Sequence, residues 1–98
     1  MHDVKQHLIR KLDMVSELVR QSEPTLWSGT SHQSAMDSLT RLRGQLVDSG
    51  PVDIIKARLL FAPTGILQEI SIDNDWGHHF LELARDVDRL LAQLKEQA

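Results

Sequence analysis

Cysteine and tyrosine are both absent from the 98 residues of this chain, and aromatic residues make up only 4% of it. Without cysteine the chain can form no disulfide, no thiolate zinc site and no cysteine nucleophile. A disulfide-free sequence is typical of a reducing compartment, so we expect a cytoplasmic protein. No apolar run approaches the roughly 20 residues that a membrane-spanning helix needs, and the residues after Met1 lack the apolar segment of a signal peptide.

An excess of basic residues is also missing. Lysine and arginine number 11 against 14 aspartate and glutamate residues, which gives a formal net charge of −3. Nucleic-acid-binding proteins usually carry a basic face, because contacts with phosphates supply much of their affinity. The acidic balance therefore argues against nucleic acid as a partner. The hydrophobic share of 41% and the charged share of 26% are typical of one soluble globular domain, here residues 1–98.

Apolar residues recur at intervals of three and four over four stretches of the chain, which predicts four main helices. The predicted helices cover residues 3–21, 33–48, 51–61 and 76–96. Their starts are predicted from residues that favour a first turn. These are Asp3, Ser31 or Ser34, Pro51, and Asn74 or Asp75.

Residues 66–74, with the sequence ILQEISIDN, fit either a short helix or a strand. A single strand would have no partner, because no second strand-like run exists in the chain. We therefore predict a helical turn after Thr64, followed by an extended stretch. The expected fold is all-α, a compact bundle of four main helices with a short irregular or helical insert around residues 62–75.

Several residues carry expectations about packing. The helix over 51–61 is apolar almost all round, which predicts a central position, and Leu60 and Leu91 are expected in the core. Gly44 interrupts a predicted helix at a cost of about 1 kcal/mol relative to alanine, which a close approach of two helices would explain. Trp27 is expected to cover the core from a polar loop.

Signatures of metal binding and catalysis are missing. The histidines that lie near one another in sequence are His2 with His7 and His78 with His79, and neither spacing matches the i, i+4 pair of a helical zinc site. A calcium loop beginning at Asp73 would place Ala84 where a carboxylate is required. The chain has no Gly-x-Ser-x-Gly motif and no glycine-rich phosphate loop. We expect no enzyme, no metal and no cofactor.

One charge pattern points to a function. No lysine or arginine occurs between Arg58 and Arg85. The acidic residues Glu69, Asp73 and Asp75 lie in this stretch beside Trp76. Charges of one sign steer a partner and an aromatic residue anchors it, so these four residues form the predicted protein-binding site, with Trp76 as anchor if it faces outward. The alternative is a solvated helix start with Trp76 turned inward.

The segment 59–72, LLFAPTGILQEISI, resembles part of a family of short, uncharacterised bacterial proteins. In that pattern a helix ends in Leu-Phe, a turn containing glycine follows, and a short polar and apolar run comes next. Trp27 matches an upstream tryptophan of the pattern. Ala62-Pro63 stands in place of paired glycines, and Gln68-Glu69 in place of an Asn-Asp-like pair.

Small acidic all-helical proteins of this kind are similar to bacterial immunity proteins, which bind and block a toxin. The resemblance implies a protein-binding module, most specifically an immunity-type inhibitor of a toxin or effector domain. The acidic stretch would then imitate a phosphate or complement a basic active-site rim. The alternative is a structural or regulatory homodimer, joined by apolar faces of the first and last helices that exceed what one chain buries.

Overall fold

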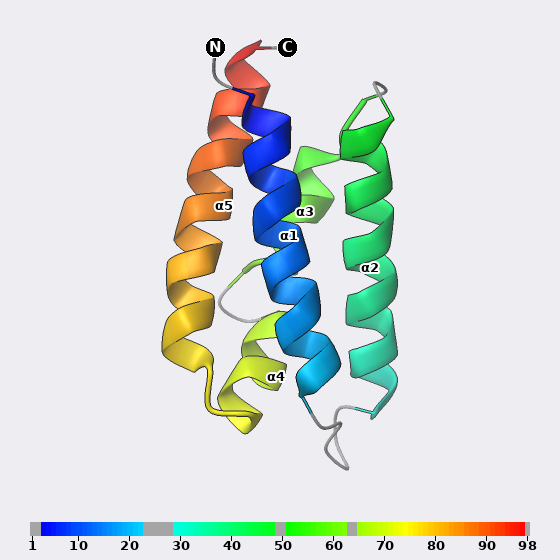
Figure 1. Cartoon of the computed structure of the whole chain (residues 1–98), viewed down its shortest axis with the longest axis vertical. Helices are drawn as coiled ribbons and strands as arrows, with labels where there is room; N and C mark the ends of the chain where they lie inside the picture. The colour runs from blue at the N-terminus through cyan, green and yellow to red at the C-terminus, as the bar shows by residue number, and fades with distance from the viewer. Residues whose placement is uncertain (1–2, 23–28, 49–50, 63–64, 98) are drawn as a thin grey trace.

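Five helices form an elongated bundle in the computed structural model, which describes residues 3–22, 29–48, 51–62 and 65–97 (Figure 1). They are α1 (Val4–Gln21), α2 (Gly29–Val47), α3 (Ile54–Leu60), α4 (Ile66–Asp73) and α5 (Gly77–Gln97). The long helix α1 packs against both α2 and α5. The two chain ends lie at one end of the bundle and α4 lies at the other. The all-α prediction is confirmed for the described residues, and the bundle measures 42 × 23 × 20 Å.

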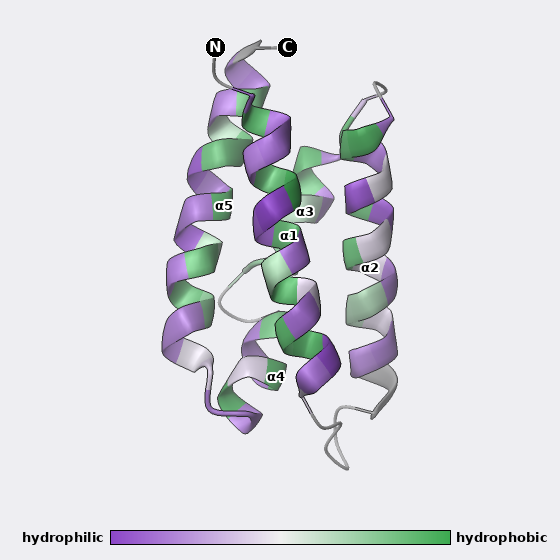
Figure 2. Cartoon of the chain, viewed as in Figure 1, coloured by the Kyte–Doolittle hydropathy of each residue, from purple (hydrophilic) through white to green (hydrophobic). Residues whose placement is uncertain are grey.

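The first and last helices follow the predicted pattern closely. The Asp3 carboxylate accepts a hydrogen bond from the Gln6 amide at 3.1 Å, which satisfies one of the free N–H groups of the first turn of α1. The buried residues of α1 recur every three or four positions: Val4, Leu8, Leu12, Val15 and Val19. Figure 2 shows the same division in α5, with polar residues along its outer edge and apolar residues toward α1.

Helix α2 begins earlier than predicted, at Gly29 rather than near residue 33. Ser31 and Ser34 therefore lie inside the helix and do not cap it. The explanation expected for Gly44 is also wrong. A Cβ atom built on Gly44 would meet no atom within 4 Å, so no helix approaches closely there.

Helix α3 is shorter and less central than predicted. It begins after Asp53, whose carboxylate accepts from the Lys56 amide at 3.0 Å, so Pro51 lies before the helix. Only Ala57 is buried within α3. Leu60 is half-buried against the core and not fully inside it, whereas Leu91 is buried as expected. The helix lies on the side of the bundle, where it contacts α2 and α5.

The insert around residues 62–75 contains the complete helix α4 instead of one turn and an extended stretch. Its buried residues are Leu67, Ile70 and Ser71. Because α4 packs against α2 and α5 and also contacts α1, tertiary contacts cover its apolar side and stabilise a segment whose local sequence is ambiguous.

The core joins all five helices. Phe80 is fully buried, stacks on Phe61 with ring centroids 6.1 Å apart, and meets Trp76 edge-on at 6.2 Å. The other buried apolar residues outside α1 are Ala35, Leu39, Leu42, Leu46, Ala57, Leu67, Ile70, Leu83, Val87, Leu90 and Leu91. Trp27 lies outside the described residues, so the expectation that it covers the core stays a prediction.

Candidate functional site

Three of the four predicted site residues lie together on the surface of the α4 end. Glu69 and Asp73 are four residues apart in α4, so they share one face of that helix. Asp75 lies just beyond the helix, and all three side chains are exposed. We call these three carboxylates, with Ile72, the α4 surface.

Ile72 is a member of this surface that the sequence did not single out. Its side chain is 59% exposed, on the same outward side of α4 as Glu69 and Asp73. Interfaces commonly combine an apolar centre with a charged rim, and Ile72 beside the carboxylates gives this arrangement on a small scale. The signal that could have found it is the helical alternative for residues 66–74, which places Ile72 opposite the buried Ile70 side.

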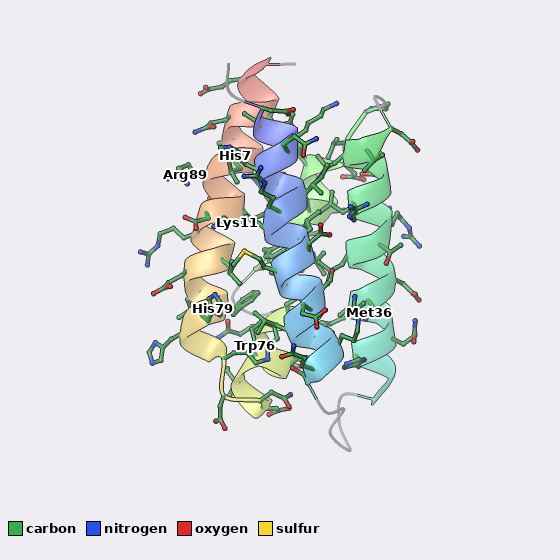
Figure 3. The ribbon with its side chains drawn as sticks, in the orientation of Figure 1. His7, Lys11, Met36, Trp76, His79 and Arg89 are labelled. Atoms are coloured by element: carbon green, nitrogen blue, oxygen red, sulfur yellow. The ribbon has the colours of Figure 1, made fainter. Side chains whose placement is uncertain are left out.

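Trp76 does not face outward. It is only 8% exposed, and Figure 3 places it among the helices at the α4 end. Its indole Nε1–H donates to the Ser22 hydroxyl at 2.8 Å, across 54 positions of sequence. The condition for Trp76 as an anchor is therefore not met, and the inward orientation that the sequence left open is the one observed. Its role is to connect the end of α1 to the α4–α5 turn.

The turn between α4 and α5 explains both Trp76 and Asp75. The Trp76 amide donates to the Ser71 carbonyl at 2.9 Å and the Asp75 amide to the Ile72 carbonyl at 3.4 Å. These two bonds form the Schellman motif, in which the residue after the C-cap adopts a left-handed conformation. That residue is Asp75, with a φ of 64°. The prediction that Asn74 or Asp75 caps α5 is wrong, because Trp76 directly precedes that helix and its carbonyl accepts from the Phe80 amide.

At the same end of the bundle, side chains donate hydrogen bonds to carbonyl groups in the last turn of α1. The Ser22 hydroxyl, which accepts from Trp76, itself donates to the Leu18 carbonyl at 2.7 Å. His32 of α2 places Nε2 2.7 Å from the Val19 carbonyl, and since a carbonyl only accepts, Nε2 carries the proton. Side chains from α2 and from the α4–α5 turn thus fix the end of the bundle that carries the α4 surface.

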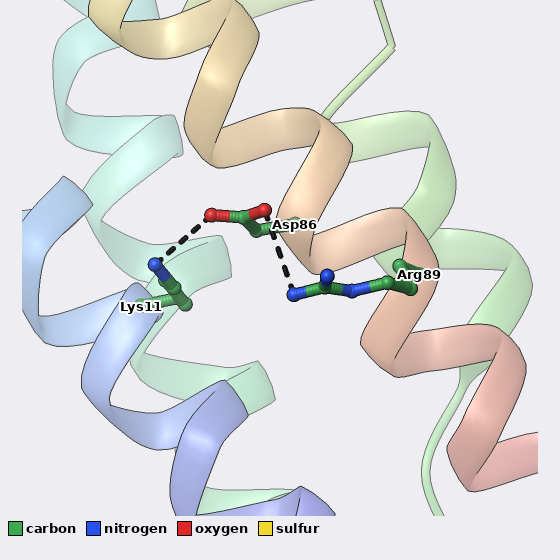
Figure 4. Close-up of polar contacts among 3 residues, drawn as sticks. All are labelled: Lys11, Asp86 and Arg89. Atoms are coloured by element: carbon green, nitrogen blue, oxygen red, sulfur yellow. Dashed lines mark hydrogen bonds and ion pairs between the residues drawn. The ribbon is translucent and has the colours of Figure 1, made fainter.

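An ion pair joins α1 to α5 farther along the bundle. Lys11 Nζ lies 3.0 Å from Asp86 Oδ2, and Arg89 lies 3.6 Å from Oδ1 of the same carboxylate (Figure 4). The hydrogen bond from Lys11 is the main cause that lowers the pKa of Asp86 below its usual 3.8; partial burial opposes it, and the charges of Lys11, Arg89 and Arg85 add to it. The group holds two helices together and leaves no unpaired carboxylate for chemistry.

A second surface lies along α3 and was not predicted. A groove of about 340 Å³ separates α2 from α3 and reaches the start of α4. Beside it, Ile55 and Leu59 of α3 are 73% and 66% exposed. The sequence pattern failed here because a nearly apolar helix was assigned to the core, whereas α3 is short and covers the bundle from one side.

The expectations about metal sites and membrane spans are tested only for the described residues. Among the described residues, no group of three or more histidine, aspartate or glutamate side chains is placed to hold a metal ion. No described helix combines the length and the apolar character that crossing a bilayer requires. Most apolar residues of α1 and α5 are buried within the chain, whereas Met14 of α1 and Leu81 of α5 are 43% exposed. The homodimer stays a prediction.

The chain matches no protein-family model, no curated protein and no solved structure.

Proposed function

We propose that this chain is a protein-binding module that meets its partner through the α4 surface. In the more specific form of the proposal, it is an immunity-type inhibitor that neutralises a toxin or effector domain. The observation that carries the proposal is the grouping of Glu69, Asp73 and Asp75 around the exposed Ile72. Acidic groups on a firmly packed helix suit a partner with a basic rim around its active site, because opposite potentials accelerate encounter and fix orientation.

The support beneath this surface favours the same proposal. The buried side of α4 is held by Leu67, Ile70 and Ser71, and its end is closed by the Schellman turn. Binding therefore requires little ordering of this helix, which lowers the entropic cost of association. Neither Glu69 nor Asp75 forms an ion pair with another described residue, so a partner need not displace an existing pair to reach them.

The test is co-expression with the proteins encoded beside this chain, followed by kinetics on a complex of one copy each. We expect the variant Glu69→Lys/Asp73→Lys to associate at least about tenfold more slowly, and wild-type association to slow as salt rises. The control Asp48→Lys/Glu96→Lys makes the same change in net charge at the other end of the bundle, on two exposed residues, and should associate nearly as fast as the wild type.

The Ile72→Ala variant addresses the apolar centre, and we expect it to dissociate faster without a lower melting temperature, since Ile72 is exposed. If the partner is a toxin, its activity should fall in the complex in proportion to occupancy. Unchanged association of the Glu69→Lys/Asp73→Lys variant, together with salt-insensitive binding of the wild type, would contradict the proposal. A complex that leaves the toxin fully active would contradict its more specific form only.

A further inference from the structure

Helix α3 differs from the other helices in the apolar surface that it leaves uncovered. Ile55 and Leu59 are 73% and 66% exposed, the two largest values among the large apolar side chains that the structure describes. They are four residues apart, so they stand next to each other on one face of α3. Large exposed apolar residues placed side by side are typical of a binding surface rather than of the rest of a monomer.

The groove continues this apolar face toward α2. Its volume of about 340 Å³ falls within the range of sites that bind ligand groups. Leu42, Leu59, Leu60 and Ile66 give it apolar walls, and Ile66 lies one turn before Glu69 of the α4 surface.

The charge of the groove is opposite in sign to that of the chain. Arg41 and Lys56 lie on its two sides, and neither forms an ion pair within the described ranges. Among the lining residues that the structure describes, Asp53 is the one acid, and its carboxylate accepts a hydrogen bond from the Lys56 backbone amide in the first turn of α3. The chain as a whole has a net charge of −3, so two uncommitted cations beside an apolar groove favour an anionic partner.

We propose that this groove, with the exposed face of α3, binds an amphipathic helix of another protein whose apolar stripe is flanked by carboxylates. Apolar side chains at i, i+3 or i+4 and i+7 of such a helix would cover Leu59 and Ile55 and enter the groove. Its carboxylates would pair with Arg41 and Lys56. This proposal goes beyond the function assigned to the α4 surface and does not depend on it.

Two other occupants fit the surface less well. A second copy docked by two-fold symmetry would present the same patch to itself. The interface would then hold Arg41 and Lys56 of both copies against Asp53 of each, which leaves an excess of positive charge. A small carboxylate ligand would fill the groove but leave Ile55 uncovered, because Ile55 does not line the groove.

The experiment uses a designed, fluorescently labelled peptide of about 18 residues, long enough to form a helix, with leucine along one face and glutamate on both flanks. A companion peptide replaces every glutamate with lysine. We expect the glutamate peptide to bind at least about tenfold more tightly at low salt, with the difference shrinking as salt rises. NMR shift changes should concentrate on residues 38–45 and 53–60, and Arg41→Glu/Lys56→Glu should reverse the preference between the two peptides.

Matched variants separate the contact from a general effect of apolar surface. Ile55→Asp and Leu59→Asp should each abolish binding of the glutamate peptide without lowering the melting temperature. Val47→Asp makes the same change at a residue that is 56% exposed and outside the groove lining, and should bind as the wild type does. The Glu69→Lys/Asp73→Lys variant should also bind at least as tightly as the wild type, which keeps this test independent of the α4 surface.

Several results would overturn the proposal. Equal affinity for both peptides, or no binding of either, would contradict the role of the two cations. Peptide binding that survives Ile55→Asp would show that the exposed face of α3 takes no part in the contact, which contradicts the proposal. The mass of the wild type in solution could also rise with protein concentration. If Leu59→Asp restores the mass of a monomer, the surface binds a second copy instead.

Discussion

Asp75 adopts a backbone conformation that is unusual for a residue other than glycine. It occupies the left-handed position of the Schellman motif, with a φ of 64°, where glycine is the usual residue because it has no Cβ to clash. Aspartate tolerates this conformation better than most residues. Its presence is compatible with a surface role, since Asp75 is exposed and adds a third carboxylate to the α4 surface.

The Asp75→Gly variant should therefore be more stable than the wild type, by about 0.5–1 kcal/mol in the free energy of unfolding, because it relieves the left-handed conformation. Denaturant titration measures the change. The control Asp75→Ala removes the same charge but keeps a Cβ, so it should give no gain. A gain of equal size in Asp75→Ala would mean that charge repulsion, and not backbone conformation, sets the cost.

Two glycines should respond in opposite ways to alanine. Gly44→Ala should raise the free energy of unfolding by about 0.5–1 kcal/mol, since the helix gains propensity and the added Cβ has free space. Gly65→Ala should lower it, because the Cβ would lie 3.1–3.3 Å from the carbonyl oxygens of Leu59, Ala62 and Leu60. Thermal or denaturant unfolding measures both changes. A lower free energy of unfolding in Gly44→Ala would show that the added Cβ meets a neighbouring atom, and would contradict the prediction.

Trp76 and Ser22 should behave as a coupled pair. Ser22→Ala leaves the buried indole N–H without an acceptor, which costs about 1–3 kcal/mol, and Trp76→Phe removes the same hydrogen bond together with some packing. The double variant should cost less than the sum of the two single variants, since both remove one interaction. Strict additivity in a double-mutant cycle would show that the 2.8 Å contact contributes nothing to stability.

Among the elements, length and periodicity decide how well the sequence predicts structure. The helices over 3–21 and 76–96 were predicted within one residue of α1 and α5, because several turns of apolar spacing outweigh local ambiguity. For the eight residues of α4 the sequence predicts only one helical turn, since so short a segment fits both the helical and the strand period. Contacts with distant helices stabilise the helix. Helix α3 was assigned to the core from composition alone, which does not distinguish a central helix from a peripheral one.

For the candidate site, the sequence predicts the exposed carboxylates but neither the orientation of Trp76 nor the groove beside α3. The exposure of Glu69, Asp73 and Asp75 follows from their charge, which resists burial. The inward orientation of Trp76 depends on Ser22, a residue 54 positions away, and no local pattern connects them. The groove beside α3 depends on how two helices are spaced, which is a property of the tertiary structure.

The contact between α1 and α5 predicts a pH effect. Because the pKa of Asp86 is lowered in the folded protein, the Lys11–Asp86 pair stabilises the fold above the ordinary pKa near 3.8, and this contribution is lost as the pH falls through the lower, folded-state value. Asp86→Asn should therefore reduce stability at pH 7 by about 0.5–1 kcal/mol, a modest value for a partly exposed pair, and by much less near pH 2.

Asp88 provides the control for this prediction. It also pairs with a base, Arg58, but at 3.6 Å and with a more exposed side chain than Asp86. Asp88→Asn should change the free energy of unfolding at pH 7 by a smaller amount. A loss in Asp86→Asn that is the same at both pH values would mean that the substitution disturbs packing rather than the ion pair.

At the scale of the whole molecule, the two surfaces proposed for binding differ in the sign of their charge. The α4 surface presents carboxylates at one end of the bundle, and the groove beside α3 presents the cations of Arg41 and Lys56. A rigid core of five helices holds both surfaces in place, with the α4 end fixed by the contacts of Trp76, Ser22 and His32.

The central claim is that a partner protein covers the α4 surface, and hydrogen–deuterium exchange tests it most directly. The chain is measured free and in its complex with the partner found by co-expression. We predict that exchange slows most over residues 66–76, and that Glu69→Lys/Asp73→Lys reduces this protection at the same partner concentration. Protection confined to other helices, with exchange across 66–76 unchanged on binding, would contradict the claim.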